Sequence, residues 1–104
     1  MLKMVYVEGC YCPQFFCDAC RGRIEDAARA HYLWYVPPDT MHPADGDIAH
    51  VHKECDRPFT QTRGGQGHWN WGLLQDLLIY LGRNVQFDRR AAEQHLNELA
   101  QIGL

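Results

Sequence analysis

Apolar and polar residues follow two periods along this chain, a strand-like alternation in the first half and a helical spacing near the end. Residues 2–7 alternate and predict a short strand. Residues 31–36 are rich in strand-favouring side chains, and residues 47–52 alternate between polar and apolar. Proline and glycine interrupt the segment between them, so these two strands are expected to pair as a hairpin with a long loop.

The helical spacing covers the last third of the chain. Leucines recur every three or four residues and predict a helix over residues 70–82. Asp88 has the position of an N-cap for a second helix, residues 89–102, and Gly103 has that of the glycine that often follows a helix. The two helices are expected to form an antiparallel hairpin over the first half of the chain.

The remaining segments are expected to be irregular. Residues 9–20 are predicted to be a cysteine-rich loop, because Pro13 disfavours both a helix and a central strand. Residues 60–68 are predicted to be a glycine-rich polar linker, without the spacing of a phosphate-binding loop. Residues 24–31 fit either a short helical turn or an irregular link.

The composition fits one small globular domain rather than a disordered chain. The 104 residues are 46% hydrophobic and 22% charged. A net charge of −3 disfavours tight non-specific binding of nucleic acid, which usually needs a basic surplus. We see no secretory signal and no apolar stretch of membrane-spanning length, so we expect a cytoplasmic protein with no membrane partner.

The cysteines point to a metal site. An odd number of cysteines, five, clustered with histidines, favours metal binding in a reducing compartment over disulfides. Cys17 and Cys20 form a Cys-x-x-Cys pair, whose thiolates can hold one ion while the backbone between them points N–H groups at the sulfurs. His52 and Cys55 have the same spacing, and on a helical turn both side chains reach one face. The four residues form a Cys3His set, which predicts one structural Zn²⁺.

A second reading of the cysteines predicts a different cofactor. Cys12, Cys17 and Cys20 have the spacing of plant-type 2Fe–2S ferredoxins, with Cys55 as a distant fourth ligand. This alternative implies electron transfer. Against it, Pro13 and bulky aromatic residues crowd a loop in which those proteins use small residues.

His50 is an alternative to His52 as the histidine ligand. Its spacing to Cys55 is less suitable, so His52 is favoured. Cys10 and Cys12 are left over in the zinc interpretation. We expect ordinary packing or an exposed thiol for them, and a second, partial zinc site is the less favoured alternative.

The segment from Phe16 to Ile24, with sequence FCDACRGRI, resembles the zinc knuckle of treble-clef zinc fingers. The His52-x-x-Cys55 pair resembles the closing ligands of that fold, which lie at the start of a short helix. The same pairs resemble the first half of a LIM domain, but the segment between them is longer and the second zinc half is absent. The resemblance covers residues 16–57, and it implies a fold and a structural zinc rather than a LIM partner.

The predicted architecture is therefore a single α+β domain over residues 1–104. Residues 1–59 form a zinc-stabilised, treble-clef-like half with a knuckle and a β-hairpin, and residues 69–104 form a helical hairpin. Four ligands close the metal site, and no catalytic motif is present, so we do not expect an enzyme.

The function that best fits this reading is binding to another protein, as an adaptor or an inhibitor. The chain is rich in tryptophan and tyrosine, which are favoured anchors at interfaces. Trp69, beside the glycine-rich linker, is the best anchor candidate, and Arg57 and Arg63, which follow the last ligand, are further candidates. Trp34 and Trp71 are expected in the core. The alternative is a zinc-finger regulator that binds nucleic acid through its arginines.

Overall fold

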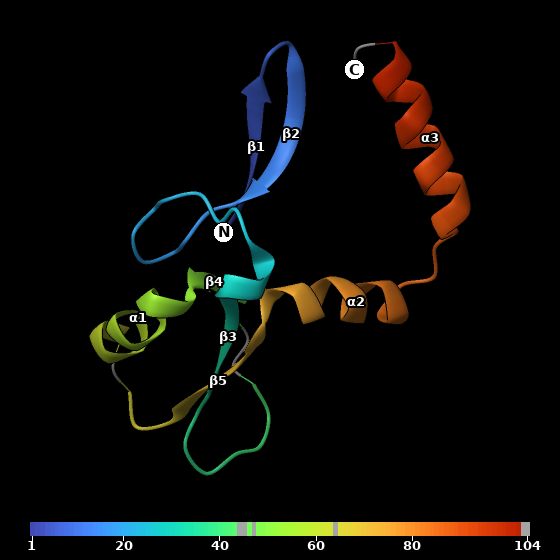
Figure 1. The fold of residues 1–104 in the computed structure, drawn as a ribbon. Helices are drawn as coiled ribbons and strands as arrows, with labels where there is room; N and C mark the ends of the chain where they lie inside the picture. Colours follow the sequence, from blue (N-terminus) through green and yellow to red (C-terminus); the bar gives the residue numbers. More distant parts are fainter. Residues whose placement is uncertain (44–45, 47, 64, 103–104) are drawn as a thin grey trace.

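The fold is known from a computed structural model, which describes residues 1–43, 46, 48–63 and 65–102. It confirms the α+β class, since the described residues form two small antiparallel sheets and three α-helices. In Figure 1 the first hairpin and the last helix project from a body built on the larger sheet, and the second helix extends sideways from that body.

Strand β1 (Leu2–Val7) pairs with strand β2 (Cys10–Phe15) in a two-stranded sheet. Glu8 and Gly9 connect them, with φ angles of 50° and 84°. Two positive φ angles in a two-residue connection are typical of a type I′ turn, whose twist matches that of a hairpin. The predicted loop over residues 9–20 is thus wrong for β2, because a two-stranded sheet has only edge strands, and an edge accepts Pro13.

The larger sheet has the order β4–β3–β5. Strand β3 (Ala30–Val36) lies in the centre, antiparallel to β4 (Ala49–His52) and to β5 (His68–Leu73). The predicted pairing of the two strands of the zinc-bearing half is confirmed, with Leu33 opposite Ala49.

Strand β5 corrects the predicted helix over residues 70–82. Helix α2 (Leu74–Asn84) begins four residues later, because Trp69 and Trp71 alternate with smaller or polar residues and pair with β3. Leucine spacing alone could not separate the end of this strand from the start of the helix. The helical continuation from Leu74 is confirmed.

The predicted linker over residues 60–68 is wrong at its start, because helix α1 (Asp56–Arg63) includes residues 60–63. It follows a short 3-10 turn, η2 (Lys53–Cys55), which extends directly from β4. Pro58 is tolerated because the first turn of a helix leaves its N–H groups without intrahelical partners. A second 3-10 turn, η1 (Ala27–Arg29), precedes β3 and agrees with the expected helical turn.

One apolar cluster joins the knuckle, the larger sheet, α1 and α2. Leu33, Val51 and Leu74 are its fully buried aliphatic side chains, and Cys17 belongs to it as well. Cys17, a predicted metal ligand, is therefore part of the core, so the candidate site and the core depend on each other. The cluster's buried members are Cys17, Ile24, Ala30, Leu33, Ala49, Val51, Phe59, Leu74 and Leu77.

Helix α3 (Arg89–Gln101) begins as predicted, with the Asp88 carboxylate accepting a hydrogen bond from the backbone N–H of Ala91 at 3.0 Å. The expected antiparallel hairpin does not form, because α3 turns away from α2 and buries none of its residues (Figure 1). Gly103, expected at its end, lies outside the described residues. Across the described chain, every helix is too short or too polar to span a bilayer.

Candidate metal centre

Four ligand atoms converge where the knuckle meets the end of β4. The Sγ atoms of Cys17, Cys20 and Cys55 and a ring nitrogen of His52 all lie within 4.8 Å of one another. Zn–S bonds of about 2.3 Å and Zn–N bonds of about 2.0–2.1 Å put the ligand atoms of a tetrahedral site roughly 3.5–3.8 Å apart. The cluster therefore has the size of a single metal site, and the predicted ligand set is the one that the fold brings together.

The knuckle is shaped by hydrogen bonds to sulfur. The backbone N–H groups of Ala19 and Cys20 each donate to Cys17 Sγ at 3.4 Å, and that of Gly22 donates to Cys20 Sγ at 3.4 Å. Cys17 N also donates to Gly22 O at 2.8 Å, which closes the turn. The loop thus directs N–H dipoles at both sulfurs, as expected for thiolates that bind a cation.

Cys17 is an unusually acidic thiol. Its burial opposes ionisation, but N–H donation from Cys20, His52 and Ala19 outweighs burial and lowers its pKa from 9.0 to about 6. Near neutral pH this sulfur is therefore a thiolate before any ion binds. A buried thiolate needs a positive partner, and a metal ion supplies one.

His52 is held in the tautomer that a ligand requires. Its Nε2 lies 3.0 Å from the carbonyl oxygen of Arg23, and since a carbonyl only accepts, Nε2 carries the proton. The opposite nitrogen, Nδ1, lies 3.3 Å from Cys20 Sγ and is left to coordinate. Metal-bound histidines commonly donate their second N–H to such a carbonyl, which fixes the ring.

Cys55 enters from η2, three residues after His52, as the spacing predicted. Burial, and then the neighbouring sulfurs of Cys17 and Cys20, raise its pKa from 9.0 to about 12. Without an ion, burial and the negative charge of neighbouring sulfurs oppose ionisation of Cys55, so this thiol stays protonated near neutral pH. A bound divalent cation removes this repulsion and allows all three to ionise.

The alternative ligands lie outside the cluster. Cys12 is in β2, two residues from Cys10 and on the same face of the hairpin, and it is not among the residues that converge. This arrangement does not supply the ferredoxin-like set. The ring of His50 packs on Phe15, with centroids 5.0 Å apart, and its Nδ1 is 4.0 Å from the Asp18 carboxylate.

Asp18, between the two knuckle cysteines, joins the knuckle to β4. The backbone N–H of His50 donates to Asp18 Oδ2 at 2.7 Å, and the Asp18 N–H donates to the His50 carbonyl at 2.8 Å. These bonds set the distance between the two ligand pairs. Sequence reasoning missed this role, because nothing in the spacing shows which strand the knuckle will contact.

The residues predicted to bind a partner, Arg57, Arg63 and Trp69, belong to α1 and β5. Arg57 is exposed, and the guanidinium of Arg63 lies 3.8 Å over the ring of Phe59. Trp69 is half-buried against Phe59 and Tyr35. Trp71, expected in the core, is 58% exposed and stacks on His31, so that expectation is corrected.

No protein-family model matches the chain, and neither the curated proteins nor the solved structures yield a match. The resemblance to treble-clef and LIM-type zinc modules therefore rests on ligand spacing and local geometry. What the structure establishes is a mixed α+β chain with a Cys3His cluster suited to one metal ion.

Proposed function

We propose that this chain is a zinc-stabilised module that binds another protein, with one structural Zn²⁺ held by Cys17, Cys20, His52 and Cys55. The proposal is supported by the convergence of three cysteine sulfurs and one histidine nitrogen, which are donors that Zn²⁺ prefers. Because four protein ligands complete a tetrahedral shell, the ion has no open position for a substrate. A structural role, without catalysis, follows from this.

Binding to a protein is supported by the side chains around the site rather than by the site itself. Several aromatic rings of the larger sheet are only half-buried, and α2 and α3 expose apolar residues along their length. Exposed apolar patches of this kind are typical of interaction surfaces. Thiols that serve as ligands also fit a reducing compartment such as the cytoplasm.

Elemental analysis of the purified chain tests the metal, with an optical spectrum recorded beside it. We expect one zinc per chain and no visible absorption, and iron with visible colour would return the ferredoxin-like alternative. His52→Ala is expected to lower both zinc retention and thermal stability, since structural zinc binding is coupled to folding. Cys12→Ser is the matched control and is expected to change neither.

The binding role is tested by affinity capture with the zinc-loaded chain as bait and by a gel shift with plain DNA and RNA. We expect the zinc-loaded chain to capture one protein in an amount close to that of the bait itself. The His52→Ala variant is expected not to capture it. A salt-sensitive shift of nucleic acid at low ionic strength, without a captured protein, would favour the regulator alternative instead.

A further inference from the structure

One side of the β1–β2 hairpin is an uncharged, apolar surface, which we call the hairpin face. Its six residues alternate along the two strands and lie opposite one another in the register of the sheet: Leu2, Met4, Tyr6, Tyr11, Pro13 and Phe15. The rings of Tyr6 and Tyr11 have centroids 5.1 Å apart, in agreement with a common side for these residues. None of the six is an acidic or basic residue.

The hairpin face is large for a surface that stays in water. Leu2, Met4, Tyr6 and Tyr11 are between 62% and 75% exposed. At roughly 200–250 Å² of surface per large side chain, these four alone leave about 600 Å² accessible. The largest apolar patch of a typical monomer is about 300–600 Å², and patches at the upper end of this range commonly mark interaction sites.

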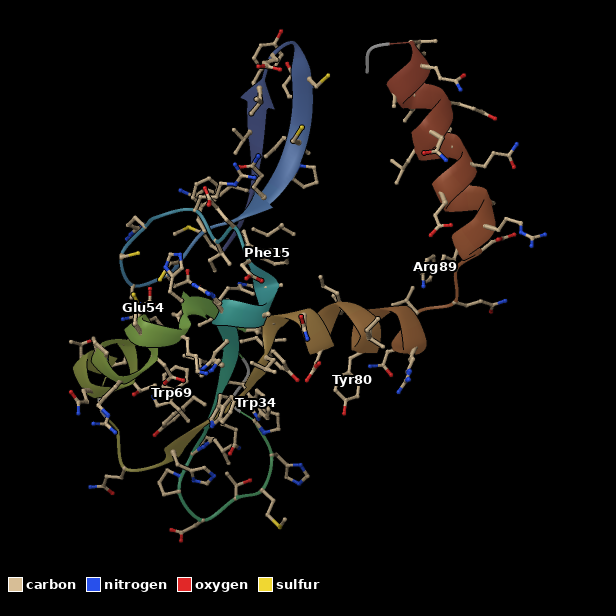
Figure 2. All side chains as sticks on the ribbon, in the orientation of Figure 1. Phe15, Trp34, Glu54, Trp69, Tyr80 and Arg89 are labelled. Carbon is tan, nitrogen blue, oxygen red and sulfur yellow. The ribbon has the colours of Figure 1, made fainter. Side chains whose placement is uncertain are left out.

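Only the foot of the hairpin is attached to the body. Phe15, which Figure 2 labels where β2 joins the body, is half-buried and packs on His50 with ring centroids 5.0 Å apart. Among the described strands, β1 and β2 pair only with each other. An isolated two-stranded hairpin is marginal in water, and a further layer over its apolar side stabilises it.

The whole chain also exposes more surface than a compact monomer of its mass. Its accessible area is 8139 Å², against about 6,000 Å² for a compact protein of 12.0 kDa. Each partner of a standard protein–protein interface buries about 800 Å². The excess is sufficient for such an interface, and the hairpin face alone supplies most of one partner's share.

The chemistry of the hairpin face favours a second copy of this chain as its cover. A face without acidic or basic residues has no charge to select an unlike partner, and its packing on itself brings no like charges together. Its ends also complement each other. A two-fold axis across the strands places the Tyr6 ring over Leu2 of the second copy, so that an aromatic ring at the tip packs on an aliphatic side chain at the foot.

The same axis is compatible with the shape of the molecule. Each hairpin projects from its body, so an arrangement of tip over foot keeps the two bodies at opposite ends of the paired hairpins (Figure 1). Closed two-fold dimers are also the commonest oligomers of soluble proteins.

We propose that this chain forms a two-fold symmetric homodimer in which the hairpin faces of the two copies pack on each other, tip over foot. The contact uses side chains rather than the edge of β2, because Pro13 lacks the N–H that an added strand would need there. The candidate metal ligands lie outside the hairpin, so dimerisation and metal binding are separate properties.

Light scattering of the zinc-loaded chain, measured after gel filtration, tests the proposal. At about 100 μM we expect a mass near twice the 12.0 kDa of one chain, and dilution should return the mass of one chain because interfaces of this size are weak. Tyr6→Lys places a charge in the packed face and is expected to weaken dimerisation more than about tenfold. Val7→Lys, on the opposite side of the same strand, is the matched control and should dimerise as the parent chain does.

A second measurement keeps the proposal testable if Tyr6→Lys does not fold. In a mixture of isotope-labelled and unlabelled chains, isotope-filtered NMR detects only contacts between copies. We expect such contacts between the Tyr6 ring of one copy and the Leu2 methyl groups of the other.

Three outcomes would overturn the proposal. The chain is monomeric at every concentration, or Tyr6→Lys and Val7→Lys weaken the dimer equally, or the chain is monomeric and binds phosphatidylcholine vesicles through Tyr6, which would assign the face to a lipid surface. Failure of the proposed function instead appears as missing zinc or missing capture of another protein, which none of these measurements reads.

Discussion

At the scale of single residues, the metal site combines side chains whose protonation is set by their surroundings. N–H donation makes Cys17 acidic, whereas burial and the neighbouring sulfurs keep Cys55 protonated until an ion binds. Burial opposes protonation of His52, but the Arg23 carbonyl and Cys17 outweigh it and raise its pKa. Metal and protons therefore compete for the same atoms.

This competition predicts that zinc affinity falls as the pH falls. From alkaline to neutral pH, each bound ion displaces the Cys55 proton, because that pKa is about 12 without metal. His52, whose pKa is raised above 6.5, gains a proton first as the pH falls, and Cys17 gains one below a pH of about 6, so the decline steepens. Competition for zinc with a chelator, repeated across this pH range, measures the affinity.

The matched control for the pH profile is His95→Gln, which replaces an exposed histidine of α3 far in sequence from the ligands. Its profile should superimpose on that of the parent chain. A zinc affinity that stays constant from neutral to mildly acidic pH would contradict the ligand assignment.

A second residue-scale prediction concerns His31, which is 6% exposed. Its Nδ1 lies 2.6 Å from Asp56 Oδ2, and its buried Nε2 has no hydrogen-bond partner within the described residues. Asp56→Ala leaves both ring nitrogens unpaired, at a cost of about 1–3 kcal/mol. Urea unfolding of the zinc-loaded chain measures the loss, and Glu25→Ala, at an exposed carboxylate, should lose under about 0.5 kcal/mol.

At the scale of elements, β5 depends on a glycine. A Cβ added to Gly72 would lie 2.5 Å from Cε1 of Tyr32, whose ring lies across this position. Gly72→Ala is therefore expected to displace that ring and to destabilise the fold by about 1–3 kcal/mol. Thermal unfolding followed by circular dichroism tests this expectation.

Gly46→Ala is the control for Gly72→Ala, because nothing lies within 4 Å of a Cβ added there. The two variants make the same chemical change, so only the space around each glycine differs. Equal stability of both variants would show that the Tyr32 ring does not pack on β5 as described.

Elements fixed by local chemistry were predictable from the sequence, and those fixed by distant pairing were not. Cys17 and Cys20 define a knuckle within a few residues, and Asp88 caps its own helix. In contrast, β5 becomes a strand only through its pairing with β3, whose paired residues lie 32–42 positions earlier in the chain. The β2 strand was obscured by Pro13, which only an edge strand tolerates.

At the scale of the whole molecule, the chain is more extended than a compact domain of its length. Its radius of gyration is 16.4 Å, against about 13 Å for a compact chain of this size. Figure 1 shows the reason, since the β1–β2 hairpin and α3 both project from the body. The four candidate metal ligands come from the knuckle, β4 and η2, so the site can form without α3.

This shape predicts that α3 is the least stable element. It buries none of its residues, and Leu96 remains 64% exposed. An isolated helix of 13 residues is marginal in water, and the Asp88 cap together with the Arg89–Glu93 pair at 2.9 Å offsets only part of that deficit.

Hydrogen exchange measured by mass spectrometry checks this prediction. Amides of α3 are expected to exchange close to the rate of an unstructured peptide, whereas those of β3 are protected by the global stability of the zinc-loaded fold. If α3 were protected as strongly as β3, its exposed apolar side chains, such as Leu96, would have to be covered in solution. Dilution separates the two ways of covering it, because protection given by a second copy is lost on dilution and protection given by the chain's own body is not.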